Sequence, residues 1–225
     1  MCGRFGFSIP PRRAWEYFQL ADMHGSEIRR NIPPGTDIPV IVLDDDDPSR
    51  RVLRFFHWGL VPSWADDPKI GYKLINARGG TAPDKPAFRN AFARRRCLIP
   101  ADRFYEWEKR PDGTKQPYAI TMADHSPFAM AGLWEHWTKQ DGEELFSAII
   151  LTTEANELVA HVHDRMPVIL APEDYGRWLA PDADPESLRE LIRPYPAEGM
   201  ALVQVSTRVN DPKNQDIGPE QCLLT

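Results

Sequence analysis

The second residue of this 225-residue chain is a cysteine, and that position can give it unusual chemistry. A small residue after the initiator methionine favours removal of Met1, which would leave Cys2 with a free α-amine beside its thiol. With reference pKa values of about 7.7–8.0 and about 8.5, both groups are partly nucleophilic near neutral pH. An amine condenses with an aldehyde to an imine, and a thiol on the same residue can close the imine into a thiazolidine ring. Cys2 is therefore either a nucleophile for aldehydes or an incidental cysteine, and other residues must decide.

Two further segments carry polar groups suited to such a reaction. Asn76 and Arg78 are two residues apart in an extended stretch, so their side chains share one side and could hold a phosphate or a sugar oxygen. Glu106 lies among the three aromatic residues of Phe-Tyr-Glu-Trp at 104–107. Loss of water around this carboxyl would raise its pKa and suit it to proton transfer near neutral pH. The alternative for Glu106 is a solvent-facing position on an amphipathic strand.

The segment His-Val-His-Asp-Arg-Met-Pro at 161–167 gathers two histidines, a carboxylate and an arginine. A metal site built on His161 and His163 would need a third ligand, and none is suitably spaced, so the sequence predicts no metal. An acid–base role for a histidine oriented by a neighbour fits better. The chain contains no GxGxxG, Walker, HExxH or GxSxG motif, so we expect neither a nucleotide nor another cofactor.

The composition is that of an ordinary globular protein, with 42% hydrophobic and 27% charged residues. The formal net charge is -6, so attraction to nucleic acid must come from local arginine clusters, at 12–13, 29–30, 50–51 and 94–96. The alternative is that these clusters are solvated surface.

Three cysteines without CxxC spacing indicate neither a disulfide framework nor a zinc site, and no apolar run approaches the length of a membrane span. We therefore expect a cytoplasmic protein with no membrane partner.

The candidate site residues must be positioned by secondary structure, and the sequence predicts short strands interrupted by short helices. Helices are expected at 12–22, at 154–161 after a Thr152/Thr153 cap, around 88–92, and from Pro172 and Pro185, the last capped by Asp184. A hairpin with an acidic loop is expected from 38–43 and 51–56, and further strands at 97–100, 118–122, 128–133, 146–152, 167–170 and 200–206. Because strands dominate and do not alternate with helices, we predict an α+β fold with mainly antiparallel sheet. No repeat or linker divides the chain, so 1–225 is predicted to be one domain.

Taken together, these segments resemble the SOS-response-associated peptidase (SRAP) family, whose members crosslink to abasic sites in DNA. The resemblance rests on eight segments that follow in order along the chain: Met-Cys-Gly-Arg-Phe at 1–5, Arg-Asn-Ile-Pro-Pro-Gly at 30–35, Trp-Gly-Leu-Val-Pro-Ser-Trp-Ala at 58–65, Ile-Asn-Ala-Arg at 75–78, Arg-Cys-Leu-Ile-Pro-Ala at 96–101, Phe-Tyr-Glu-Trp at 104–107, His-Asp-Arg-Met-Pro-Val-Ile-Leu at 163–170 and Val-Ser-Thr-Arg-Val-Asn at 205–210.

The resemblance implies antiparallel sheets that form a barrel-like body, with Cys2 as the nucleophile at the floor of a basic channel. It implies that Asn76 positions the cysteine and the sugar, that Glu106 moves protons, and that His163 assists opening of the sugar. The DNA contacts that it implies are Arg4 and Arg78 for phosphates, with Pro62 and Trp64 for stacking near the lesion. The partner would be single-stranded DNA with an abasic site, bound by a monomer that joins the nucleoid when on DNA.

The sequence departs from the usual pattern of the family at two places, and two other functions are also considered. Gly79-Gly80 stand where the family usually has an acid, which predicts a more mobile loop, and Arg103 stands where a small residue is expected, so it either contacts phosphate or points to solvent. The first alternative is an N-terminal-nucleophile cysteine hydrolase, a peptidase-like or autoproteolytic enzyme that uses the same Cys2, and a lyase activity is a further expectation. The second is a noncovalent single-strand-binding module, which the acidic net charge disfavours.

Overall fold

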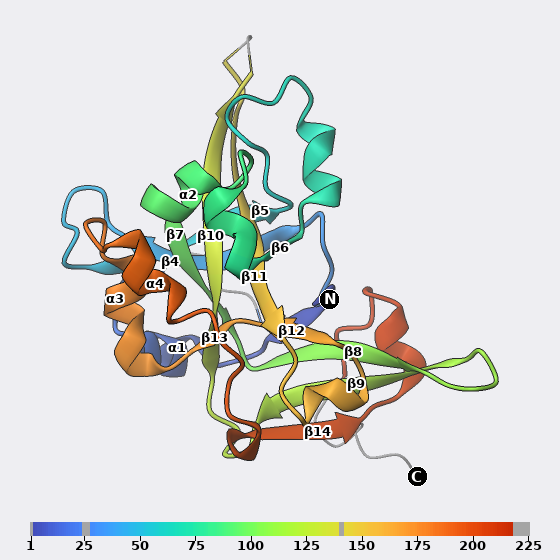
Figure 1. The fold of residues 1–225 in the computed structure, drawn as a ribbon. Helices are drawn as coiled ribbons and strands as arrows, with labels where there is room; N and C mark the ends of the chain where they lie inside the picture. Colours follow the sequence, from blue (N-terminus) through green and yellow to red (C-terminus); the bar gives the residue numbers. More distant parts are fainter. Residues whose placement is uncertain (1, 24–27, 140–141, 218–225) are drawn as a thin grey trace.

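The computed structural model describes residues 2–23, 28–139 and 142–217, which form two sheets with short helices around them (Figure 1). The first sheet has five strands in the order β14-β9-β8-β1-β3, and every neighbouring pair is antiparallel. Its strands are β1 (Phe5–Phe7), β3 (Arg29–Ile32), β8 (Arg103–Lys109), β9 (Lys115–Met122) and β14 (Met200–Gln204).

The second sheet follows the path β12-β11-β10-β7-β4-β5-β2, with β13 beside β10 and β6 beside β11. Its strands are β2 (Leu20–Met23), β4 (Asp37–Leu43), β5 (Arg51–Trp58), β6 (Asn76–Arg78), β7 (Arg96–Ala101), β10 (Phe128–Thr138), β11 (Glu144–Glu154), β12 (Arg165–Pro167) and β13 (Ile169–Leu170). Because β5 also pairs with β11, the strands β11, β10, β7, β4 and β5 close into a five-stranded barrel. The fold is thus α+β with mainly antiparallel pairing, as the sequence predicts.

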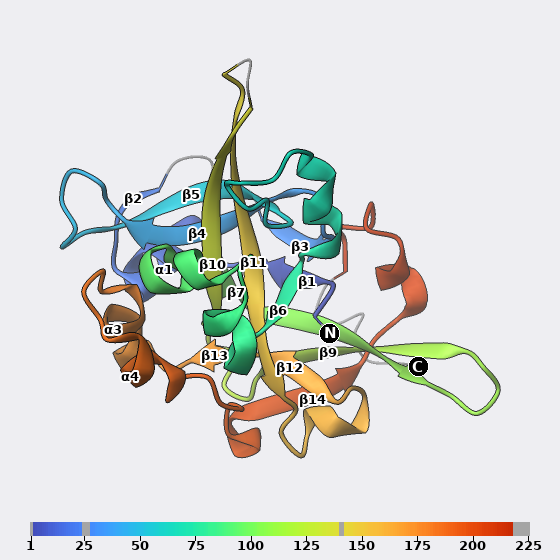
Figure 2. The ribbon, with the colours of Figure 1, turned by 45° about the horizontal axis from the view of Figure 1, so that its top comes forward.

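Helices are short and lie against the outside of the barrel (Figures 1 and 2). The α-helices are α1 (Pro11–Phe18), α2 (Arg89–Arg94), α3 (Tyr175–Leu179) and α4 (Pro185–Arg189). Short 3-10 helices lie at Pro68–Lys73, Gly79–Asp84, Val159–His161, Pro172–Asp174, Ala197–Gly199 and Thr207–Asn210. None of the helices in the three described ranges is long and apolar enough to cross a membrane.

Several local predictions are confirmed. The β4–β5 hairpin pairs Ile38 with Phe56 and Leu43 with Arg51 around the acidic loop. Helix α4 begins at Pro185, and the Asp184 carboxylate accepts hydrogen bonds from the backbone N–H groups of residues 186 and 187. The strands expected from residue 97 onward are all present, and the segment predicted at 167–170 is divided between β12 and β13.

Two helix predictions are wrong in extent. Helix α1 ends at Phe18, because Gln19 adopts the left-handed conformation and Leu20 begins a strand that pairs with β5. The expected helix at 154–161 is reduced to the 3-10 turn Val159–His161, since β11 continues to Glu154. Thr152 does not cap a helix there: its hydroxyl donates to the carbonyl of Ala77, 3.2 Å away.

Candidate active site at the junction of the two sheets

Cys2 lies just before β1 in the first sheet, and it is joined directly to the second sheet. The side-chain Nδ2 of Asn76, the first residue of β6, donates a 2.7 Å hydrogen bond to the backbone carbonyl of Cys2. Strand β6 runs parallel to β11, with Asn76 opposite Ile150 and Arg78 opposite Thr152. Cys2 is therefore positioned through its backbone by a residue 74 positions later in the chain.

The Cys2 side chain is fully buried. Burial, together with the negative charge of Glu106, raises the pKa of its thiol well above the usual range, and Sγ lies 3.8 Å from the carbonyl oxygen of Arg4. The expectation that this thiol is partly ionised near neutral pH is therefore wrong for the chain that carries Met1. The raised pKa favours the protonated thiol at neutral pH.

Glu106 supplies a carboxyl group beside Cys2. It lies on β8, whose residue Tyr105 donates its backbone N–H to the carbonyl of Arg4 at 2.9 Å. The Glu106 side chain is only 4% exposed, and burial, with the negative charge of Asp164, raises its pKa to about 7. The predicted desolvated carboxyl is confirmed, and the solvent-facing alternative is excluded.

His163 lies in the turn that leads into β12. Its Nδ1 accepts the backbone N–H of Arg165 at 3.0 Å and lies 2.9 Å from a carboxylate oxygen of Asp164. Burial lowers the pKa of His163, which favours the neutral form of the ring at neutral pH. Asp164 acts electrostatically on both His163 and Glu106, so this turn lies near Glu106.

Arg78 and Arg165 bring two positive charges to one edge of the site. Arg78 ends β6 and is exposed, whereas Arg165 begins β12 and donates to the carbonyl of Thr152 at 2.7 Å. Burial and the nearby charge of Arg78 both lower the pKa of Arg165. Two cations placed this close repel each other, and an anion bound between them removes that cost. The contribution of Arg165 was missed from the sequence, because its nearness to Arg78 depends on both strands lying beside β11.

Arg4 is tied into the protein. Its Nη1 donates to Oδ1 of Asn31 at 2.7 Å and to the carbonyl of Val209 at 2.8 Å, and its guanidinium lies 5.8 Å from the centre of the Trp107 ring. Asn31 is fully buried and donates to three carbonyl groups of the segment 209–214. Arg4 thus adds positive charge near Cys2 but has less freedom than Arg78 to reach a ligand.

The segment after β5 presents one aromatic ring to solvent. Trp64 is 57% exposed, whereas Pro62 is buried and accepts the backbone N–H of Ala65 in a turn. Trp64 borders an open groove of about 630 Å³ that also contacts Trp137 on β10. Of the two residues expected to stack, Trp64 alone offers an accessible face.

Comparison with known proteins shows the family of this chain. The model of the SOS response associated peptidase (SRAP) family matches residues 1–212. The chain belongs to this family. The abasic site processing protein YoqW of Bacillus subtilis is 42% identical over 221 residues, which cover 95% of this chain and 96% of YoqW. The abasic site processing protein HMCES of Xenopus tropicalis is 32% identical over 95% of this chain and 76% of its own length.

Solved structures show the same fold. A crystal structure of a protein from Bacteroides thetaiotaomicron superposes with a TM-score of 0.85 at 25% identity, covering 96% of this chain and all of that one. A second protein, from Bordetella bronchiseptica, gives a TM-score of 0.79 at 30% identity over 91% of this chain.

At both places where the sequence departs from the usual family pattern, the structure differs from what the sequence predicts. The pair Gly79-Gly80 begins a 3-10 helix packed against the body, because a Cβ on Gly79 would lie 2.4 Å from Cγ2 of Ile192. The prediction of a loop made mobile by two glycines is therefore wrong at Gly79. Arg103 neither reaches for phosphate nor points to solvent: it is buried, with Nε 3.2 Å from Oδ1 of Asp102.

The remaining cysteines and basic clusters lie outside the site or outside the described residues. Cys97 is fully buried on β7, and burial raises the pKa of its thiol, while Cys222 lies outside the described residues. Arg96 is not a surface cation, since its guanidinium donates to backbone carbonyls of α2 and α3. Within the described ranges, no group of three or more His, Cys, Asp or Glu residues could hold a metal ion.

Proposed function

We propose that this SRAP protein captures abasic sites in single-stranded DNA by forming a covalent bond through Cys2 after Met1 is removed. The observation that carries the proposal is the Asn76–Cys2 hydrogen bond, which fixes the backbone of Cys2 where the charge of Glu106 acts on its thiol. The relatives YoqW and HMCES are named abasic site processing proteins, and an abasic sugar opens to an aldehyde, the partner that an α-amine and a thiol require.

The first covalent step joins the Cys2 α-amine to C1′ of the opened sugar. The amine nitrogen attacks the aldehyde carbon, and the resulting carbinolamine loses water to give an imine. His163 is proposed to assist sugar opening by taking the proton from the C1′ hydroxyl, because its lowered pKa leaves the ring neutral, and so available as a proton acceptor, at neutral pH. Glu106, with a pKa of about 7, can donate the proton that leaves with water.

The second step closes the ring without net loss or gain of a proton. The Cys2 sulfur adds to the imine carbon, and the thiol proton passes to the imine nitrogen, giving a thiazolidine. Because burial keeps this thiol protonated, a nearby base must accept the proton during transfer. Glu106 is placed for that role, since its charge acts directly on the Cys2 thiol.

Asn76 offers a second group to the reacting atoms. Its Oδ1 is buried and has no hydrogen-bond partner among the described residues, while its Nδ2 holds the Cys2 carbonyl. An unpaired buried carbonyl oxygen costs about 1–3 kcal/mol, so a donor that reaches it is favoured. The α-amine of processed Cys2 and a hydroxyl of the opened sugar are both such donors.

Arginines and an aromatic ring account for DNA binding despite the net charge of -6. Arg78 and Arg165 are proposed to hold a phosphate beside the lesion, with Arg4 contributing positive potential. Trp64 is proposed to stack on a neighbouring base, and Pro62 to support the turn that presents Trp64. A single strand suits the site because its sugar is reached without unstacking a duplex.

A cysteine peptidase remains the second candidate because the matched family is described as a peptidase. A peptidase nucleophile acts as a thiolate, and the buried Cys2 thiol, with its raised pKa next to a carboxyl, is poorly suited to that role. Removal of the first residue is the one peptide cleavage that the proposal requires.

The test is a crosslinking assay on the protein whose intact mass shows that Met1 is absent. A single-stranded oligonucleotide with one abasic site is expected to give a complex that survives denaturation, whereas the undamaged oligonucleotide gives none. The same protein is incubated with a peptide library. Equal yields with damaged and undamaged DNA would refute the proposal, and turnover of peptides without crosslinking would establish the hydrolase instead.

A further inference from the structure

We propose that Tyr72 is an additional base-stacking residue, which takes the base next to the abasic nucleotide on the side of Asn76 opposite to Arg78. This inference rests on the proposed function, because it assigns a contact to the DNA strand that the Cys2 site would hold. It begins from the most exposed large hydrophobic side chain of the described residues, since 70% of Tyr72 is accessible to solvent.

The backbone that carries Tyr72 is fixed by a close crossing of two glycines. Tyr72 lies in the 3-10 helix Pro68–Lys73, where a Cβ on Gly71 would lie 2.6 Å from the carbonyl oxygen of Gly59. Next to this crossing, the backbone N–H of Leu60 donates to the carbonyl of Leu74 at 3.0 Å. Only glycine allows the two backbones to approach this closely. The backbone is therefore anchored on both sides of Tyr72, at Gly71 and at Leu74.

The same helix is anchored at its other end and on its inner face. Asp67 caps it, with its carboxylate accepting the backbone N–H of Lys69 at 2.9 Å. Ile70 packs into a small apolar cluster formed by Val61, Ala65 and Trp137. An exposed ring on a rigid support loses little conformational entropy when a flat ligand stacks on it, which is the condition for efficient base stacking.

The position of Tyr72 along the chain connects it to the reaction site. Tyr72 precedes Asn76 by four residues, so the two Cα atoms are at most about 14 Å apart. Arg78 follows Asn76 by two residues, so Asn76 lies between Tyr72 and Arg78 along the segment. A DNA strand that follows this segment would meet an aromatic ring, then the reactive centre, then the paired cations of Arg78 and Arg165.

A nucleobase is the occupant that this surface fits best. The Tyr72 ring lies beside the turn at Gly35, where an added Cβ would be 3.9 Å from Cε1 of the ring, and most of the ring remains open. Exposed Lys69 and Lys73 flank it within the same helix and can attract the phosphates on either side of a stacked base. A base face is recognised by an aromatic ring whatever its sequence, which suits a protein that must bind lesions in any context.

The test measures noncovalent affinity of the Met1-free protein for short single strands that carry a tetrahydrofuran abasic analogue, whose ring cannot open. Three strands are compared: one with bases on both sides of the analogue, and two that end at the analogue on one side or the other. Tyr72→Ala is expected to weaken binding about 5- to 100-fold for the two strands that keep the base which stacks on Tyr72. Its affinity for the third strand, which lacks that base, should equal that of the wild type. Tyr72→Phe, which keeps the ring, should bind like the wild type.

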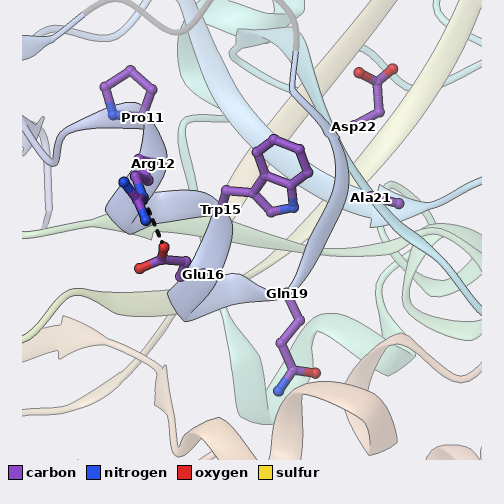
Figure 3. Close-up of a pocket in the computed structure, with 7 residues that line it drawn as sticks. All are labelled: Pro11, Arg12, Trp15, Glu16, Gln19, Ala21 and Asp22. Atoms are coloured by element: carbon purple, nitrogen blue, oxygen red, sulfur yellow. Dashed lines mark hydrogen bonds and ion pairs between the residues drawn. The ribbon is translucent and has the colours of Figure 1, made fainter.

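Trp15→Ala is the matched control, because Trp15 is also exposed, at 54%, but lies on the outer face of α1 in a pocket with Arg12 and Gln19 (Figure 3). Helix α1 lies away from β6 and β12 in both ribbon views (Figures 1 and 2). Equal affinity of Tyr72→Ala and wild type for all three strands would overturn the inference, as would a loss that is the same for all three. Wild-type crosslinking to an authentic abasic strand, run in parallel, shows separately whether the proposed function holds.

Discussion

The side-chain amide of Asn76 holds the backbone carbonyl of Cys2 at 2.7 Å, and this bond links the two sheets at the reactive residue. Because the bond uses the backbone carbonyl of Cys2, it does not involve the thiol. The anchor is a short strand, β6, whose own position depends on parallel pairing with β11. The geometry of the nucleophile is thus set by the body of the protein.

Replacing Asn76 by Asp removes the donor from this bond and adds a negative charge near Glu106. We expect the rate of crosslinking to fall by about 10²-fold or more, because misplacing a reacting group by about 1 Å costs that much. Asn90→Asp, an exposed substitution on α2, is the matched control and should react normally. Single-turnover crosslinking rates measure the effect, and a wild-type rate in Asn76→Asp would remove the positioning role.

Cys2→Ser separates the two covalent steps. The variant keeps the α-amine after Met1 removal but has a much poorer nucleophile for closing the ring, so it should form an imine that decays unless borohydride reduces it. The wild-type adduct should survive without reduction. Adduct lifetimes are compared for wild type, the serine variant and a form that retains Met1. A serine adduct as durable as the wild type's, or equal crosslinking by the Met1-bearing form, would contradict the two-step scheme.

Glu106→Gln should make the protein more stable at high pH. The pKa of Glu106 is about 7 in the folded chain against its usual value of 4.5, so the folded state binds this proton more tightly than the unfolded state. The stabilisation is fully present below about pH 4.5 and is lost as the pH rises through about 7. A pKa difference of roughly 2.5 corresponds to about 3 kcal/mol. Urea unfolding at pH 5 and pH 8.5 measures the free energy of unfolding of both proteins. The difference in this free energy between Glu106→Gln and wild type should be larger at pH 8.5 than at pH 5. Glu157→Gln, a substitution at an exposed position, should show no such change with pH.

Arg78→Gln should reduce the salt dependence of DNA capture. Each phosphate contact to a single strand contributes about 0.7 to the slope of log K against log salt, so losing one contact lowers the slope by about that amount. Arg13→Gln, an exposed arginine on α1, serves as the control of equal charge. Fluorescence anisotropy with the tetrahydrofuran strand over a salt series gives both slopes. Identical slopes in the two variants would assign the effect to net charge alone.

Substitutions at the adjacent residues Gly79 and Gly80 should differ in their effect on stability. An added Cβ at Gly79 meets Ile192 at 2.4 Å, whereas at Gly80 it meets nothing within 4 Å. Gly79→Ala should lower stability by about 1–3 kcal/mol through overpacking and slow crosslinking by displacing Arg78. Gly80→Ala should leave both unchanged. Thermal melts and crosslinking rates of the two variants test the packing of this helix, and equal melting temperatures would show that Ile192 moves aside without cost.

The local chemistry of the site could be predicted from the sequence because it depends on near neighbours. The burial of Glu106 follows from the aromatic residues on both sides of it, and the shared side of Asn76 and Arg78 follows from their spacing. The caps at Asp184 and Pro185 also act over one turn of helix. In each of these cases, the interacting residues lie within a few positions of one another.

The rest of the site depends on pairings that no local pattern reveals. Arg165 joins Arg78 because β6 and β12 lie beside β11, and Asn31 reaches the segment 209–214 across 178 residues or more. The wrong helix at 154–161 has the same origin. Thr152 has the side chain of a helix cap, but its hydroxyl bonds to Ala77 on β6, so tertiary pairing outweighs the local preference for a helix.

The contacts of Asn31 and Arg4 with Val209 also bear on when the site can form during synthesis. Both bonds need residues near the end of the described chain, and β12 is likewise made late, so the surroundings of Cys2 cannot be complete until nearly all of the protein has been made. At about 5–20 residues per second, that leaves roughly 10 to 40 seconds in which the N-terminus is outside its final fold. Cys2 is fully buried afterwards. Removal of Met1, which the proposed function requires, would fall within this interval, before the surroundings of Cys2 close.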